Sequence, residues 1–120
     1  MYNKVFLIGR LVRDPEMRVT ASGITVCRFT IAVDKGFKNR EGENQQTADF
    51  LRIVTWRRLA EICGQYLKKG KLIAIEGRLQ VDSYEKDGEM RESAEIVADQ
   101  MQMLDRGQEN YEPASSEVAI

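Results

Sequence analysis

The sequence predicts an all-β domain with one helix, in which five strands close into a single barrel. Apolar and polar residues alternate along most of the chain, as they do in strands with one buried face. Only residues 59–67 carry helical spacing, and they fall between the third and fourth predicted strands. A length of 120 residues, 42% of them hydrophobic, suits one domain with its own core.

The first two predicted strands differ in how they are buried. Residues 3–12 are apolar on both alternating faces, which is typical of a strand buried on both sides. In a small β domain, a second subunit can cover the outer side. A turn at Asp14-Pro15 ends this strand. Residues 24–35 then alternate regularly and predict a long, half-buried strand with Arg28 on its outer face.

The segment 36–48 is polar and long for a loop. Loops of this length without secondary structure are uncommon unless they serve a function or form a hairpin. The segment contains Phe37, a large aromatic residue whose presence among polar residues is not explained by solvation of a loop. The pattern therefore leaves two alternatives open, a functional loop and a hairpin.

Residues 49–56 form the third predicted strand and carry the most informative pattern in the chain. Phe50, Arg52 and Trp56 share one face, because side chains alternate along a strand. The opposite face, suited to the core, holds Leu51, Ile53 and Thr55. Aromatic rings beside a guanidinium offer single-stranded nucleic acid a surface for stacked bases and a charge for phosphates. The alternative is a strand buried on both faces, with Arg52 extending to solvent.

One helix follows this strand. Its apolar residues recur three and four positions apart, so they line one face of about three turns, directed at the core. They are Leu59, Ile62, Cys63, Tyr66 and Leu67. On this interpretation Tyr66 is a structural residue rather than a stacking one.

Two long strands complete the domain. Residues 72–84 and 90–104 both alternate, and the Asp87-Gly88 pair between them is typical of a hairpin turn. Gly77 marks a bend or a close approach of the backbone. The domain is expected to span residues 1–106, followed by a short disordered acidic tail over residues 107–120.

The order strand, strand, strand, helix, strand, strand is that of the OB-fold, a five-stranded Greek-key barrel. That fold binds oligonucleotides with its second and third strands and with the loops between strands 1 and 2 and between strands 4 and 5. Arg28 lies on the second predicted strand, and Phe50, Arg52 and Trp56 lie on the third. Tyr84 lies in the hairpin between the fourth and fifth. These placements converge on one surface.

Charge is distributed unevenly along the chain. Residues 1–80 carry 15 Lys and Arg against 8 Asp and Glu, whereas residues 81–120 carry 3 against 11. The net charges of +7 and −8 give the overall −1. A basic body joined to an acidic end indicates contact with nucleic acid. The alternative is that the charges only solvate the surface.

Catalysis, metal and cofactor binding are not expected. The chain has no histidine, and Cys27 and Cys63 do not have the spacing of metal ligands. Asp34, Asp49 and Glu76, which a nuclease could use to hold a metal, fall on separate strands. Neither a signal peptide nor a membrane-spanning apolar run is evident. The protein is therefore expected in the cytoplasm, with reduced thiols.

Short blocks along residues 1–106 resemble, in order, the bacterial single-stranded DNA-binding protein family. Each block is weakly specific, and together they are highly specific. They are Met1-Tyr2-Asn3-Lys4-Val5, Gly9-Arg10-Leu11, Asp14-Pro15-Glu16, Arg18, Ala48-Asp49-Phe50, Leu59-Ala60-Glu61, Tyr66-Leu67-Lys68-Lys69-Gly70, Ile75-Glu76-Gly77-Arg78-Leu79 and Met101-Gln102-Met103-Leu104.

The resemblance implies a sequence-independent protein that coats and protects single-stranded DNA in replication, recombination and repair, associated with the nucleoid. The implied base-stacking residues are Phe37, Phe50, Trp56 and Tyr84. Three of these positions are often tryptophan in the family, so the stacking surface is kept but reduced. With Arg28 from the strand pattern, the expected phosphate-binding residues are Lys4, Arg10, Arg28, Lys35, Lys38, Arg52, Arg58, Lys69 and Arg78. The implied assembly is a homotetramer, a dimer of dimers in which first strands pair.

The end of the chain departs from the family. Family tails usually finish in an acidic run followed by Pro-Phe, which partner enzymes recognise, whereas this sequence ends in Glu117-Val118-Ala119-Ile120. Recruitment of replication and repair enzymes through the tail is therefore doubtful. One alternative function is a replication-restart OB-fold adaptor that lacks the recruiting tail. Another is an oligomeric interaction protein whose aromatic residues all lie in interfaces.

Overall fold

A computed structural model describes residues 2–35 and 47–105. The expectations for Phe37, Lys38 and the acidic tail lie outside these residues. The elements, in chain order, are β1 Val5–Leu11, β2 Glu16–Val19, β3 Thr25–Asp34, β4 Ala48–Trp56, α1 Arg57–Tyr66, β5 Leu72–Lys86 and β6 Glu89–Met103.

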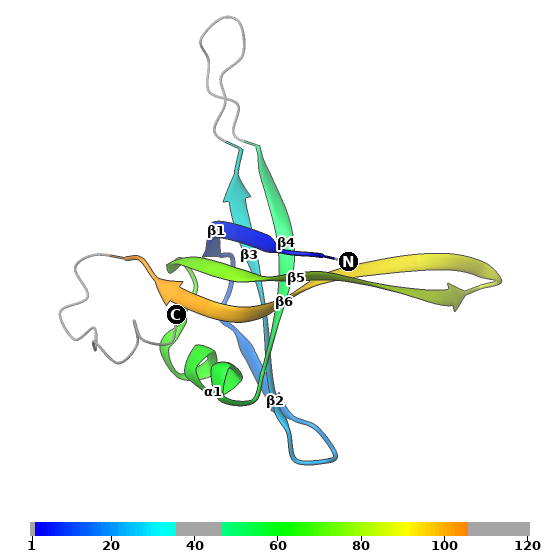
Figure 1. Ribbon diagram of the computed structural model, residues 1–120, viewed down its shortest axis with the longest axis horizontal. Helices are drawn as coiled ribbons and strands as arrows, with labels where there is room; N and C mark the ends of the chain where they lie inside the picture. Colours follow the sequence, from blue (N-terminus) through cyan, green and yellow to red (C-terminus); the bar gives the residue numbers. More distant parts are fainter. Residues whose placement is uncertain (1, 36–46, 106–120) are drawn as a thin grey trace, which may run out of the picture.

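The strands form one closed sheet. Their order is β1-β5-β6-β4-β3-β2, and an additional pairing of β1 with β3 closes the barrel. Neighbouring strands are antiparallel except β4 and β6, which run parallel. Figure 1 shows α1 at one end of the barrel and the β5–β6 hairpin extending away from it. The predicted OB-fold, with one helix following the strand at residues 48–56, is confirmed.

The structure adds a short strand that the sequence analysis did not predict. Residues of β2 pair with β3 in the register Glu16↔Arg28 to Val19↔Thr25, beyond the segment of β3 that pairs with β1. The first barrel strand is thus divided into β1 and β2 by a break that contains Asp14-Pro15. All four residues of β2 are exposed, so no alternation of burial marks the strand in the sequence.

The core is built from the inner faces of the strands and from one face of α1. Ile31, Ile53 and Ile73 are fully buried, and Cys63 of the helix packs in the same cluster. The buried Thr55 fits this apolar interior because its hydroxyl donates a hydrogen bond to the Cys27 carbonyl at 3.0 Å. The predicted core face of β4 is therefore confirmed.

The helical prediction is confirmed, with one refinement. Leu59 and Ile62 pack against the core, and Leu67, just past the end of the helix, is buried. Tyr66 is 38% exposed and lies at the margin of the buried face. It therefore contributes less to the core than its spacing suggests.

Gly77 allows two strands to approach closely. A Cβ at this position would lie 2.1 Å from the Val97 carbonyl oxygen of β6. The β5–β6 register shifts between Glu76 and Gly77, as at a β-bulge. The predicted close approach is confirmed, and the irregularity coincides with the start of the long exposed part of the hairpin.

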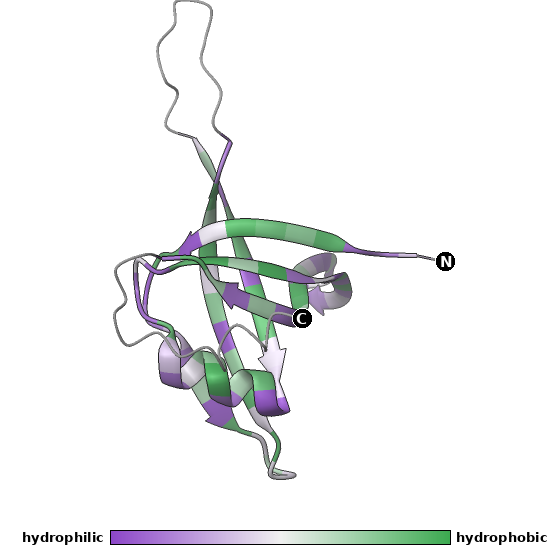
Figure 2. Ribbon diagram, turned by 60° about the vertical axis from the view of Figure 1, so that its left-hand side comes forward, coloured by the Kyte–Doolittle hydropathy of each residue, from purple (hydrophilic) through white to green (hydrophobic). Residues whose placement is uncertain are grey.

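β1 carries apolar residues on both of its faces, as predicted. Figure 2 shows a nearly continuous hydrophobic run along the strand that follows the N-terminus. Val5, Leu7 and Leu11 pack on the core, whereas Phe6 and Ile8 point outward and are 69% and 57% exposed. The outer face of β1 is thus an apolar surface that residues 2–35 and 47–105 leave uncovered.

Candidate nucleic-acid interface

The outer face of β3 and β4 carries the predicted aromatic and basic residues. Antiparallel pairing sets Ala32 opposite Phe50, Thr30 opposite Arg52, and so on along the two strands. Phe50 is 67% exposed at one end of β4, and Trp56 is 39% exposed at the other. Two aromatic surfaces therefore lie on one sheet face, with Arg52 between them.

The middle of this face is apolar and buried. Val54 is only 2% exposed and clusters with Val26 of β3 and Val97 of β6. The alternative of a strand buried on both faces thus applies to the centre of β4 and not to its two ends. These three valines lie on neighbouring strands and are called the valine floor; Val54 lies between Arg52 and Trp56 along β4, and Val26 is opposite Trp56.

Arginine side chains gather beside this floor. A hollow of about 140 Å³ is lined by Arg13, Asp14, Glu16, Arg28, Phe29, Thr30, Arg52 and Glu95. Arg28 and Arg52 were predicted site residues, whereas Arg13 was not. Arg13 follows β1 and has no alternation pattern to indicate its direction, so the sequence offered no signal for it.

Arg28 is already engaged within the protein. Its Nε donates a hydrogen bond to Oε2 of Glu95 at 3.0 Å. Glu16 is directly opposite Arg28 in the β2–β3 register. The pKa of Glu16 is lowered mainly by its hydrogen bond with Arg18, and the positive charge of Arg28 helps to lower it further.

Tyr84 lies far out on the β5–β6 hairpin, opposite Arg91. It is 46% exposed. Arg91 shares its side of β6 with Glu95 and Val97, because alternate residues of a strand face the same way. The face that bears Tyr84 is therefore continuous, through β6, with the outer face of β4.

Four of the other predicted phosphate-binding residues are also paired with carboxylates. Nitrogen–oxygen distances are 2.5 Å for Lys4–Glu76, 3.4 Å for Arg10–Asp105, 3.5 Å for Lys35–Asp49 and 3.6 Å for Arg78–Asp99. The hydrogen bond to Glu76 raises the pKa of Lys4. All four cations keep part of their surface exposed, so a phosphate could replace the carboxylate.

The predicted cations do not all lie on one face. Lys35 sits beside Asp49, near the ends of β3 and β4. Lys4 and Arg10 belong instead to the β1–β5 side of the barrel. Arg78 is opposite Val97, so it lies on the outer face that also bears Tyr84. The structure thus places Arg28, Arg52 and Arg78 on the face with the aromatic residues. Lys35 contacts Asp49, which alternates with Phe50 and faces the other side of β4.

Two further predicted residues lie near α1. Arg58 is exposed in the first turn of the helix, close in sequence to Trp56. Lys69 is exposed beyond the helix, and its backbone N–H donates to Oδ1 of Asp14 at 2.9 Å. That hydrogen bond links the segment after α1 to the turn after β1.

The two cysteines are structural. Burial raises the pKa of Cys27 to about 11 and that of Cys63 to about 12. Both thiols are free and buried, and they stay protonated at neutral pH. Among residues 2–35 and 47–105, no group of three or more His, Cys, Asp or Glu side chains could hold a metal ion. In the same residues, no helix is long and apolar enough to cross a membrane.

Comparisons with known proteins agree with this geometry. Residues 2–104 match the single-strand binding protein family. The chain is 52% identical over 104 residues to "Single-stranded DNA-binding protein 1" of Chlorobaculum tepidum, covering 85% of this chain and 64% of that protein. It is 49% identical over 106 residues to "Single-stranded DNA-binding protein" of Thermotoga maritima, covering 88% and 75%.

A solved structure shows the same fold. The structure described as "Plasmodium falciparum SSB complex with ssDNA" superposes with a TM-score of 0.77 at 25% sequence identity, covering 88% of this chain and 96% of the other. Between 64% and 75% of the two curated relatives' length is matched. From its sequence match and its barrel, the chain belongs to the single-strand binding protein family.

Proposed function

We propose that this protein binds single-stranded DNA without sequence preference and coats and protects it in replication, recombination and repair. The observation that carries the proposal is the outer face of β4, where exposed Phe50 and Trp56 flank Arg52. Membership of the single-strand binding protein family supports it, as do the names of the relatives. We place this activity at the nucleoid, in the cytoplasm.

Binding would combine stacking with charge neutralisation. Bases would stack on Phe50 and Trp56, and the track would continue to Phe37 and Tyr84, at about 1–3 kcal/mol per base. Every base has a flat face, so stacking tolerates any sequence. Duplex DNA would be excluded, because its bases already stack on each other. The proposed phosphate contacts make affinity fall as salt rises, since each contact releases condensed counterions.

Fluorescence tests the stacking role directly, because Trp56 is the sole tryptophan of the chain. Titration with oligo-dT at low salt should quench its emission, whereas a blunt duplex of equal length should not. Absence of quenching by oligo-dT, with the fold intact by circular dichroism, would contradict the proposed site.

The salt dependence of binding tests whether Arg52 contacts a phosphate. Arg52→Ala should reduce the slope of log affinity against log salt by roughly one unit if the guanidinium meets a phosphate. An unchanged slope would remove Arg52 from the phosphate path.

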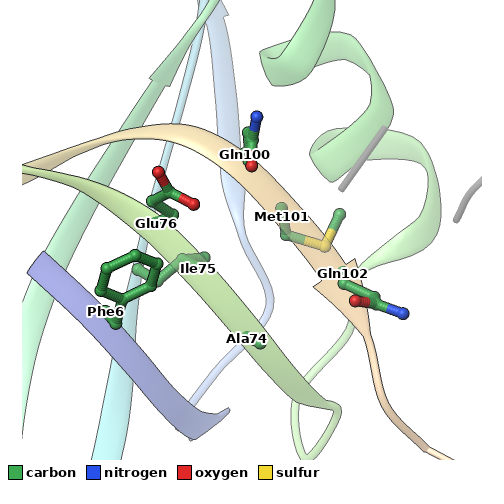
Figure 3. A pocket seen from close by; sticks show the side chains of 7 residues that line it. All are labelled: Phe6, Ala74, Ile75, Glu76, Gln100, Met101 and Gln102. Atoms are coloured by element: carbon green, nitrogen blue, oxygen red, sulfur yellow. The ribbon is translucent and has the colours of Figure 1, made fainter. Parts of the chain in front are cut away.

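We further propose a homotetramer, formed as a dimer of dimers. The support is the uncovered apolar face of β1, with Phe6 and Ile8 exposed. Figure 3 shows the Phe6 ring beside Glu76, at the edge of a hollow of about 180 Å³ that reaches Gln100 and Gln102. Exposed apolar surfaces of this kind mark contacts with other chains. Mass in solution tests it: a species near four times 13.7 kDa is expected, and a monomer would contradict the assembly.

A further inference from the structure

We propose that Glu95 acts as an internal stand-in for a phosphate, holding Arg28 until single-stranded DNA displaces it. This inference rests on the proposed binding of single-stranded DNA and names a competitor within that site. Glu95 belongs to β6, whereas Arg28 belongs to β3, and the two are 67 positions apart in the chain.

The path of the Arg28 side chain supports this role. In the sheet, β4 lies between β3 and β6, and Arg28 is opposite Val54. The side chain therefore reaches Glu95 only by crossing β4 between Val54 and Arg52, because Glu95 precedes the partner of Val54 on β6 by two residues. The ion pair thus lies at the Arg52 edge of the valine floor, on the face where DNA is proposed to run. Side-chain exposures of 52% for Arg28 and 21% for Glu95 leave the guanidinium open to a second anion.

The hollow beside the ion pair brings three arginines and three carboxylates together. Its lining includes Arg13, Arg28 and Arg52 with Asp14, Glu16 and Glu95. Arg52 is opposite Thr30, so it is a diagonal neighbour of Arg28 on the adjacent strand. Like charges at this spacing repel, and an anion between them relieves the repulsion. In the protein alone Glu95 is the carboxylate that accepts a hydrogen bond from Arg28. Asp14 instead accepts from the Lys69 backbone N–H, and Glu16 pairs with Arg18.

A phosphate offers the same chemistry with more acceptor oxygens. Guanidinium groups bind carboxylate and phosphate with the same planar set of donors. A nucleotide phosphate in the hollow would take over Arg28 and leave the Glu95 carboxylate to solvent and its counterions. When a phosphate replaces Glu95 at Arg28, the phosphate releases a counterion to solution. The freed Glu95 carboxylate attracts one in turn, so the net release of counterions is smaller.

The test compares two charge-neutralising variants of β6. Glu95→Gln keeps the shape of the side chain and removes its charge. Glu92→Gln makes the same change on the opposite face of the strand, opposite Ser83. Both are titrated with labelled oligo-dT over a range of salt, next to the wild type, and their melting temperatures are measured.

Glu95→Gln should bind oligo-dT about two- to fivefold more tightly than Glu92→Gln, which is the scale of an exposed ion pair. Its salt slope should be steeper by about 0.7, since one more phosphate contact releases its counterions in full. Adding Arg28→Ala to Glu95→Gln should abolish the steeper slope. If Glu95→Gln does not fold, Glu95→Ala replaces it in the same comparison.

Three results would overturn the inference. Equal affinity of Glu95→Gln and Glu92→Gln would show that Glu95 affects binding only through the overall charge of the protein. Weaker binding by Glu95→Gln would make the carboxylate a positioning group for Arg28. A steeper slope that persists without Arg28 would assign the effect to another cation. In each case the wild type still binds oligo-dT, whereas a wild type that does not bind refutes the proposed function itself.

Discussion

Removal of the Phe50 ring tests how much one stacking position contributes. Phe50→Ala deletes a side chain that is 67% exposed and lies at the end of β4 away from the helix. Because few core contacts are lost, the free energy of unfolding should change by no more than about 0.5 kcal/mol. The effect should appear in binding instead.

The expected loss follows from the stacking energy. One base–aromatic stack contributes about 1–3 kcal/mol, so each chain should lose roughly five- to 150-fold in affinity for oligo-dT. The lower end is favoured, because a phenylalanine ring covers less of a base than the indole common at this position in the family. Phe50→Trp should accordingly bind at least as tightly as the wild type.

Fluorescence anisotropy of labelled oligo-dT measures both variants. Tyr2→Ala is the matched control, because Tyr2 is an aromatic residue 86% exposed but outside the proposed track. The reasoning is refuted if Phe50→Ala binds as tightly as Tyr2→Ala while both melt at the wild-type temperature.

Three further predictions concern assembly and stability. Phe6→Glu places a charge on the outer face of β1 and should lower the mass in solution, measured by light scattering; an unchanged tetramer would move the interface elsewhere. Gly77→Ala should cost about 1–3 kcal/mol of stability by thermal melting, because the new Cβ meets the Val97 carbonyl; an unchanged melting temperature would show that the bulge adapts. Cys27 and Cys63 should resist a thiol reagent at pH 8, since their pKa values of about 11 and 12 keep the thiols protonated below that range; rapid labelling of the folded protein would contradict this.

Local patterns in the sequence were enough to predict the barrel. The alternation around Ile53 and Thr55 gave the inner face of β4, and the spacing of Leu59 and Cys63 gave the helix. Gly77 indicated a close approach, which the short distance from an added Cβ to the Val97 carbonyl confirms. These features depend on the direction of side chains along one element, which the sequence records directly.

Features that depend on pairing between distant strands were not predictable in this way. β2 forms because β3 is long enough to hold it, and its own four residues are all exposed. Val54 is buried on the outer face beside Val97, which belongs to a strand far along the chain. The pairing of Arg28 with Glu95 likewise requires knowing that β4 lies between β3 and β6. The sequence placed Arg28 on the outer face but could not show what it contacts.

Photochemical crosslinking identifies the aromatic residues on which the bases stack. Oligo-dT substituted with 5-iododeoxyuridine crosslinks to aromatic residues that stack on it, and mass spectrometry of the digested complex identifies them. The proposed site predicts crosslinks in peptides that contain Phe50 or Trp56 of β4. Crosslinks confined to Tyr2 and Phe6, with none on β4, would contradict it and move the path of the DNA to the β1 side of the barrel.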